Sequence, residues 1–235
     1  MLSVEHLHVY IEASHILRDV SLAVREREVV CLVGRNGAGK TTTLRSVMGY
    51  RAPHSGHIRF LGRDIAGARP SAIARLGVGF APEDSGIFAD LTVAENVEIA
   101  TWTRKTGRSA EDRLAQAYEV FPALRRYRAR KGTQISGGER KMLSIARALA
   151  LDPVMLLLDE PFEGLSPAII PEIGRSIFEI TKMGRSILIA ESNIHHVPEY
   201  TSRLYVIERG EIIFSGSPGE VQKDQAVLRV IGGTP

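Results

Sequence analysis

The sequence contains one cysteine, Cys31, among 235 residues. A single cysteine excludes a disulfide framework within the chain and a zinc site built from cysteines. Because Cys31 lies in the apolar segment VVCLV, we expect it to be a buried structural thiol.

Long apolar runs and a large charge of one sign are also lacking. No apolar segment approaches the roughly 18 residues that span a bilayer, and the segment MLSVEHLHVY has no basic part followed by an apolar one. Lys and Arg number 30 against 27 Asp and Glu, and this net charge of +3 is too mild to indicate nucleic acid. We therefore expect a soluble, cytosolic chain.

Short, almost wholly apolar segments occur at 29–33, 155–158 and 187–190, as is typical of strands buried on both faces of a parallel sheet. Helical patterns separate these segments, so the fold class is α/β. Looser alternation at 2–10, 19–24 and 57–60 indicates an antiparallel β part near the N-terminus. The segment LYVIERGEIIF predicts two strands joined by a turn at Arg209 and Gly210.

The organisation predicted from these patterns is one domain over 1–235. Its core comprises 1–83 and 153–235, including the antiparallel β part, and a helical insert occupies 84–152. The insert contains the basic segment RRYRARKG, which we interpret as a solvated helix face, because charge runs usually keep a helix in water. A binding patch is the alternative.

A phosphate-binding loop is predicted at 34–41. The residues GRNGAGKT fit the pattern G-x-x-x-x-G-K-[ST] and lie between an apolar strand and a helical segment, as the motif requires. Backbone amides of such a loop surround the β-phosphate, Lys40 neutralises phosphate oxygens and the Thr41 hydroxyl ligates Mg²⁺. The expected nucleotide-binding residues here are Asn36, Gly37, Ala38, Gly39, Lys40, Thr41 and Thr42.

Two acids end the apolar segment VMLLLDEP. Open α/β sheets bind ligands at the carboxyl ends of their strands, where Asp159 and Glu160 are expected to lie. Asp159 would hold Mg²⁺ through water, and Glu160 would orient and deprotonate the attacking water. The alternative is that the two acids merely cap a turn.

The segment ISGGE at 135–139 precedes a helical run. Ser136 and Glu139 fit a capping box, but this does not explain Gly137 and Gly138, since glycine in a helix costs about 1 kcal/mol relative to alanine. Bare backbone at a helix N-terminus suits a phosphate. Because the loop at 34–41 already supplies one complete cradle for a triphosphate, this surplus helix end predicts a second chain, packed head to tail, whose γ-phosphate it covers.

Over essentially all its length the chain resembles the ATPase subunit of an ABC transporter. GRNGAGKT resembles the Walker A loop, ISGGE the signature, VMLLLDE the Walker B strand and EGLSP the D-loop. The resemblance implies ATP and Mg²⁺ as ligands, and it implies that Ser136, Gly137, Gly138 and Glu139 close the partner's ATP site. It also implies that Tyr10 stacks on adenine, although a core tyrosine remains the alternative.

Two positions depart from the general family pattern. Glu83, in FAPEDSGIFADLTVAEN, replaces the usual glutamine and resembles the ATPase subunits of branched-chain amino acid and related amide or urea importers. We place Glu83 with Thr41 and Asp159 among the Mg²⁺ ligands. Ser192, in AESN, stands where most members have a catalytic histidine. His195 and His196 follow, and we expect them on the surface of the next helix.

The resemblance implies a motor that hydrolyses ATP to energise transport, namely import of branched-chain or other amino acids. Implied partners are a second ATPase subunit of the same or a paralogous kind, transmembrane permease subunits and, indirectly, a solute-binding protein, with a peripheral location on the cytoplasmic side of the cell membrane. Nontransport ABC ATPases of DNA repair or translation and a metabolic P-loop kinase remain alternatives. The sequence has neither the long coiled coil nor the second cassette of the former, and a kinase has no use for SGGE.

Overall fold

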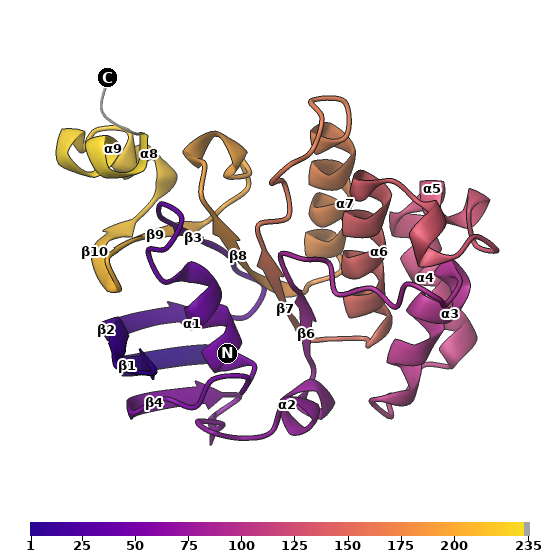
Figure 1. Ribbon diagram of the computed structural model, residues 1–235, viewed down its shortest axis with the longest axis horizontal. Coiled ribbons are helices and arrows are strands. Elements are labelled where there is room, and N and C mark those ends of the chain that lie inside the picture. The colour runs from indigo at the N-terminus through magenta and orange to yellow at the C-terminus, as the bar shows by residue number, and fades with distance from the viewer. Residues whose placement is uncertain (233–235) are drawn as a thin grey trace. The chain divides into compact units, whose positions relative to one another are not determined.

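The computed structural model describes residues 1–232. The chain divides into two compact units (Figure 1), the first formed by Met1–Ile73 with Ser186–Pro235 and the second by Ala74–Arg185. Helix α2 (Pro70–Leu76) contains the boundary between them. Each unit is described by itself.

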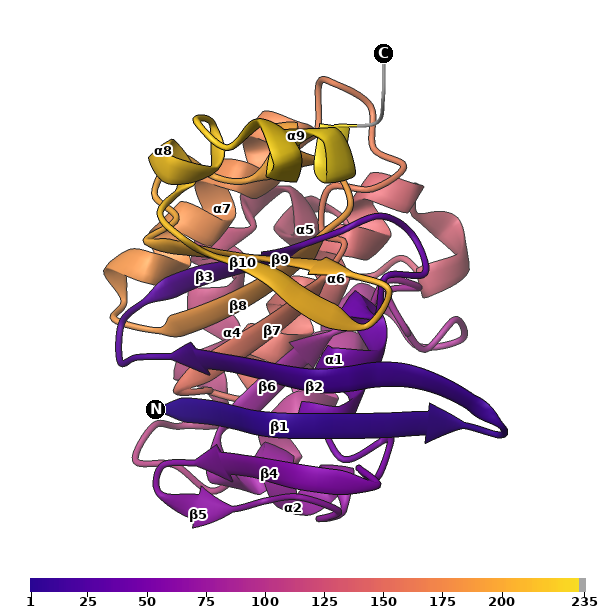
Figure 2. The ribbon, with the colours of Figure 1, turned by 90° about the vertical axis from the view of Figure 1, so that its left-hand side faces the viewer.

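An antiparallel sheet forms the N-terminal part of the first unit (Figure 2), with the strand order β2-β1-β4-β5. Leu2 pairs with Val24 on one side and with Phe60 on the other, and all three side chains are buried. This register places one apolar face of the sheet in the core. The strands are β1 (Leu2–Ile11), β2 (Ser14–Val24), β4 (Ser55–Phe60) and β5 (Arg63–Asp64).

The same unit contains a parallel group of strands in which β3 lies between β8 and β9, while β10 pairs with β9 in antiparallel fashion. Every side chain of β3 and β8 is buried, which explains their continuous apolar sequences. The elements are β3 (Val29–Val33), α1 (Lys40–Val47), β8 (Ser186–Glu191), the 3₁₀ helix η3 (Ile194–His196), β9 (Arg203–Glu208), β10 (Glu211–Gly216), α8 (Pro218–Val221) and α9 (Gln225–Gly232).

The second unit pairs two parallel strands, β6 and β7, and packs several helices around α6 (Figure 1). Nine of the α6 residues are buried, because the helix is enclosed by its neighbours. The elements are β6 (Val78–Ala81), α3 (Val93–Glu98), η1 (Ile99–Trp102), α4 (Ala110–Val120), α5 (Pro122–Arg126), η2 (Gly132–Gln134), α6 (Gly137–Ala150), β7 (Met155–Asp159) and α7 (Ile170–Lys182).

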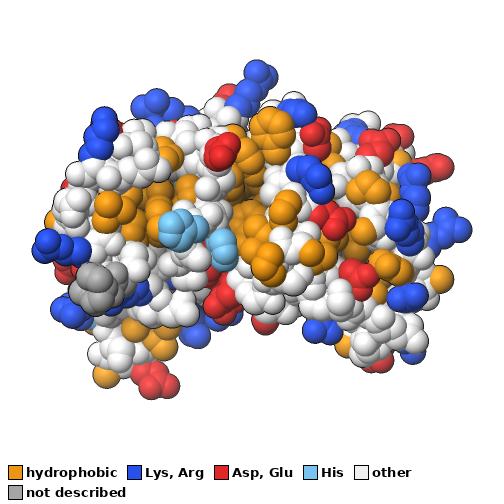
Figure 3. Space-filling view, turned by 90° about the horizontal axis from the view of Figure 1, so that it is seen from above, with side chains coloured by type: hydrophobic (Ala, Val, Ile, Leu, Met, Phe, Trp, Pro, Cys, Tyr) orange, Lys and Arg blue, Asp and Glu red, His pale blue; other side chains and the backbone are white. Residues whose placement is uncertain are grey.

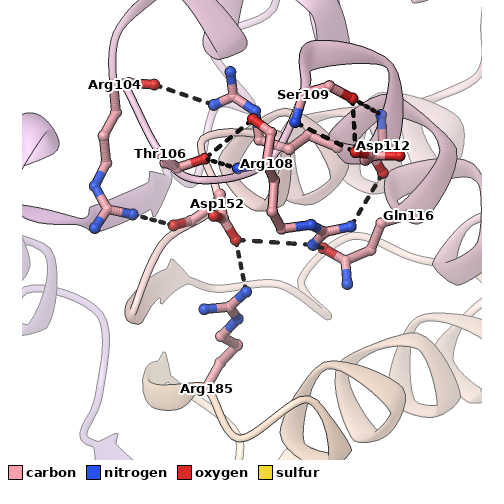
Figure 4. Close-up of polar contacts among 9 residues, drawn as sticks. Arg104, Thr106, Arg108, Ser109, Asp112, Gln116, Asp152 and Arg185 are labelled. Carbon is pink, nitrogen blue, oxygen red and sulfur yellow. Dashed lines mark hydrogen bonds and ion pairs between the residues drawn. The ribbon is translucent and has the colours of Figure 1, made fainter.

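Hydrogen bonds and ion pairs of a group of arginines connect the segment before α4 to the turn after α6 (Figure 4). Asp152 accepts from Arg185 Nη2 at 2.7 Å, and its backbone carbonyl accepts from Arg104. Arg108 lies 3.9 Å from the same carboxylate and donates to Gln116 at 2.6 Å. Asp152 is buried, so these cations supply the compensation that a buried carboxylate needs.

The predicted α/β class is confirmed, with an antiparallel β part, a parallel-rich part and a helical segment. The three apolar segments are β3, β7 and β8, and the C-terminal hairpin turns at Arg209 and Gly210, both with positive φ. The basic segment 125–131 is exposed apart from the half-buried Tyr127, over whose ring Arg130 lies at 4.5 Å. The predicted division at 84 and 152 stays a prediction.

Candidate functional site

The phosphate-binding loop connects β3 to α1 in the first unit. Helix α1 begins at Lys40, and its N-cap is Gly39, whose φ of 116° is open to glycine but strained for other residues. Within the described part of the chain no side chain caps this end, in contrast with α3, α4 and α6, which Thr92, Ser109 and Ser136 cap. The first amides of α1 therefore suit an anion, as the sequence predicts.

Lys40 is held within this loop. Its Nζ donates to the carbonyl of Gly34 at 2.7 Å and to that of Arg35 at 3.2 Å, and the side chain is 4% exposed. The Arg35 carbonyl also accepts from Ala38 N at 3.0 Å. Gly34 N donates in turn to the Glu191 carbonyl at 3.2 Å, so the loop is tied to the end of β8.

Tyr10 is exposed, so the alternative that it is a core tyrosine is excluded. Its ring is 44% exposed and pairs across the β1–β2 hairpin with His15. The two rings stack with centroids 4.2 Å apart and 7° between their planes, and His54 meets Tyr10 edge to face at 5.2 Å. Leu17, two residues beyond His15, lies 2.7 Å from the position a Gly39 Cβ would occupy, so this hairpin adjoins the phosphate loop.

The loop after β8 carries Ser192. The half-buried Ser192 follows Glu191, which is completely buried, and Glu191 Oε2 lies 3.4 Å from His196 Nδ1. The helix expected after Ser192 is present as the short 3₁₀ helix Ile194–His196, which ends there because Val197 precedes a proline and adopts an extended ψ of 119°. His195 is exposed as expected, whereas His196 is 22% exposed and faces Glu191.

In the second unit, Asp159 ends β7 and Glu160 follows it. Their exposed fractions are 1% and 3%, so neither is an exposed turn cap. Glu160 has a φ of 48°, a left-handed conformation that costs a non-glycine residue energy and that functional sites often retain. Among residues 1–232, no three His, Cys, Asp or Glu side chains gather as a metal cluster.

The signature segment forms the predicted capping box at the start of α6. Glu139 N donates to Ser136 Oγ at 3.2 Å, and Ser136 N donates to Glu139 Oε2 at 2.7 Å. The two glycines differ in what surrounds them. A Cβ on Gly138 would lie 3.1 Å from Ile169 Cγ2, whereas at Gly137 the nearest atom is Arg140 Nη2 at 3.9 Å. Packing within the chain thus accounts for Gly138 but leaves space at Gly137.

Sequence reasoning missed two cations of α6 that hold the loop of Glu83. Lys141 Nζ donates to the Glu83 carbonyl at 2.6 Å. Arg147 donates to the carbonyls of Gly86 at 2.8 Å and Ser85 at 3.1 Å. The Glu83 side chain itself is exposed. Every residue has a backbone carbonyl, so the sequence does not show which residues accept these hydrogen bonds. Only the position of Lys141 just after the signature could have suggested this contact.

Comparison with known proteins agrees with these geometries. The family model described as ABC transporter matches residues 17–163. The chain is 36% identical over 235 residues to the lipopolysaccharide export system ATP-binding protein LptB of Haemophilus influenzae, covering 99% of this chain and 97% of that protein. It is 34% identical over 234 residues to the probable branched-chain amino acid transport ATP-binding protein LivF of Archaeoglobus fulgidus, covering 99% of each.

Solved structures match as well. A nucleotide-free ATP-binding cassette from an ABC transporter superposes with a TM-score of 0.85 at 26% identity, covering 98% of each chain. A dimeric cassette in a post-hydrolysis state, bound to ADP and phosphate, gives a TM-score of 0.81 at 23% identity and covers 93% of this chain and 99% of that one. The family match, the phosphate loop and the buried strand-end acids together show that this chain belongs to the ABC transporter ATP-binding family and is an ATPase.

Proposed function

We propose that this ABC ATPase energises import of branched-chain or other amino acids, working as one half of a head-to-tail pair. The observation that carries the paired arrangement is the space at Gly137, where no side chain of residues 1–232 would come closer to a Cβ than Arg140 Nη2 at 3.9 Å. Gly137 lies in the first turn of a capped helix and has no side chain. Its backbone can therefore be approached closely by an anion from another molecule.

Within one chain, the roles follow from the chemistry of each residue. Loop amides from Asn36 to Thr42 and the Lys40 ammonium neutralise the phosphates, and Tyr10 stacks on the base. Glu160 accepts a proton from the attacking water, whose oxygen bonds to the γ-phosphorus as the bond to the β-γ bridging oxygen breaks. Ser192 donates a hydrogen bond toward the same phosphate.

Mg²⁺ suits the oxygen donors that the chain offers. The proposed ligands are the Thr41 hydroxyl and the carboxylates of Glu83 and Asp159, which are the hard oxygen donors that Mg²⁺ prefers. Bound Mg²⁺ would neutralise charge on the transferred phosphoryl group. Because Mg²⁺ usually takes one or two carboxylates together with substrate phosphates, a cluster of three protein acids is not needed.

Glu83 and the LivF relative support amino acids as the transported class. The resemblance of FAPEDSGIFADLTVAEN to amino acid importers lies in the loop that Lys141 and Arg147 hold in place. Lipopolysaccharide export is the second candidate, and the similarity to LptB favours it. The two candidates differ in their membrane subunits and not in the ATPase chemistry.

The proposed partners are transmembrane permease subunits, a second ATPase subunit and, through the permease, a solute-binding protein. Among residues 1–232, no helix combines the length and apolarity needed to cross a bilayer. We place the chain at the cytoplasmic side of the cell membrane, bound to its permease. Lys and Arg are interspersed with Asp and Glu on the face in Figure 3, and the net charge is +3, so we propose no nucleic-acid partner.

Copurification followed by transport assay tests this proposal. The tagged chain is isolated from its native membrane, its permease subunits are identified and the complex is reconstituted in vesicles. ATP-dependent uptake of labelled leucine or another amino acid is expected. Extraction of lipopolysaccharide from the vesicles without amino acid uptake would establish the second candidate instead.

A further inference from the structure

Arg35, the second residue of the phosphate loop at 34–41, directs its side chain to the last helix of the described chain. Its Nε donates to the Val230 carbonyl at 2.8 Å, and its Nη2 lies 3.4 Å from the Arg229 carbonyl. Both acceptors belong to α9, and all three residues lie in the first unit. A residue of the nucleotide loop is thus bonded to a helix about 195 residues further along the chain.

The geometry of a guanidinium suits this contact. Arg229 and Val230 are adjacent residues of α9, and each backbone carbonyl has two lone pairs with which to accept a donor. A guanidinium presents several donors in a fixed plane and keeps its charge, so it matches two adjacent carbonyls better than an ammonium does.

Helix α9 is itself held in place by other contacts. Asp224 Oδ1 accepts from Ala226 N at 3.0 Å and from Val227 N at 3.1 Å, which caps the start of the helix. Val227 and Ile231, one turn apart, are buried. Short helices are marginal in isolation, so these anchors and Arg35 decide where the described residues of α9 lie.

The main chain of Arg35 leads to the phosphate-binding lysine. Its carbonyl accepts from Lys40 Nζ at 3.2 Å and from Ala38 N at 3.0 Å. The Arg35 side chain therefore donates hydrogen bonds to α9, while its backbone carbonyl accepts one from Lys40. Displacement of α9 would break the hydrogen bonds of the Arg35 side chain. The loop that positions Lys40 would then be less ordered.

We propose that α9 is a structural part of the nucleotide site and that Arg35 is a positioning residue through which α9 keeps the phosphate loop ordered for ATP. This inference rests on the proposed role of the loop at 34–41. Order in the free loop lowers the entropic cost of binding, so loss of the contact weakens ATP binding. Coupling is reciprocal, so bound nucleotide should also stabilise α9.

The test is a fluorescence titration of the full chain with a labelled ATP analogue. Arg35→Ala is expected to weaken binding three- to tenfold, and Arg35→Lys to restore part of the loss. Val227→Asp, which removes an apolar anchor of α9, is expected to give a similar loss, and the double variant little more, because both act through one contact. Arg229→Ala is the matched control, since it removes a positive charge from α9 and keeps the carbonyl.

Hydrogen exchange gives an independent readout. Amides of 225–232 should exchange more slowly when nucleotide is bound, and this protection should be lost in Arg35→Ala. Unchanged or tighter binding by Arg35→Ala would overturn the inference, as would weak binding by Arg35→Ala alone with Val227→Asp unaffected. Retained binding by Lys40→Ala would instead contradict the assignment of the loop itself.

Discussion

The imidazole of His15 lies parallel to the phenol ring of Tyr10, 4.2 Å away, so one face of the proposed adenine-stacking ring is already covered by another ring. This stack fixes Tyr10 on the exposed edge of the β1–β2 hairpin beside the phosphate loop. An aromatic ring held in one orientation loses little entropy when a base stacks on it.

Replacing Tyr10 should therefore weaken nucleotide binding. Tyr10→Ala is expected to reduce ATP affinity about tenfold, because stacking on a base is worth about 1–3 kcal/mol. Tyr10→Phe should retain binding, since the ring and not the hydroxyl makes the contact. Isothermal titration with ATP measures both, and equal affinities for wild type and Tyr10→Ala would remove Tyr10 from the site.

Gly137 and Gly138 should respond differently to substitution. Gly137→Asp is expected to block hydrolysis, because its carboxylate would repel the partner's γ-phosphate, while thermal stability is kept, since an acid suits the first turn of a helix. Gly138→Ala should lower the free energy of unfolding by about 1 kcal/mol, because crowding against Ile169 costs about 1–3 kcal/mol and outweighs the roughly 1 kcal/mol that alanine gains over glycine in a helix. Thermal unfolding and ATPase assays on both variants check this, and full activity in Gly137→Asp would reduce ISGGE to a plain helix cap.

Ser192 should contribute little to the rate. A single neutral hydrogen bond is worth about 0.5–1.5 kcal/mol, so Ser192→Ala should slow ATP hydrolysis about tenfold at most. His196→Ala should cost about 1–3 kcal/mol of stability, because it removes a group facing the buried Glu191. His195→Ala, at an exposed position, is the matched control. Loss of activity in a histidine variant whose stability is unchanged would assign catalysis to that imidazole.

Cys31 should be inert in the folded protein. Burial raises the pKa of its thiol from 9.0 to about 12, and its Sγ lies 3.4 Å from Thr201 Oγ1. The folded chain therefore keeps a proton that the unfolded chain releases above pH 9, and the free energy of unfolding should fall by about 1.4 kcal/mol per pH unit from pH 9 toward pH 12. Urea unfolding of wild type and Cys31→Ala between pH 8 and pH 10.5 measures this difference. The same slope in both proteins would contradict it.

The strands and the nucleotide motifs could be predicted because their signals are local. Continuous apolar segments identify β3, β7 and β8, and the positive φ of Gly39 follows from the loop motif itself. The pattern at Ser136 and Glu139 likewise predicts its own capping box.

Contacts between distant segments could not be predicted in this way. Arg35 meets the carbonyls of α9, and a carbonyl is present at every residue, so the sequence of α9 carries no mark of the contact. Ile169 crowds Gly138 only because the fold brings the chain before α7 to the start of α6. The helix expected after Ser192 is limited to one 3₁₀ turn, because Pro198 disfavours a helical backbone at Val197.

Phosphate release by the assembled transporter, measured with wild-type chain and with Glu160→Gln, tests the proposed catalytic centre most directly. General-base catalysis typically contributes about 10²–10⁴-fold, so the variant should lose at least a hundredfold in hydrolysis while binding ATP with Mg²⁺ normally and accumulating as closed pairs. Hydrolysis by Glu160→Gln at the wild-type rate would contradict the account.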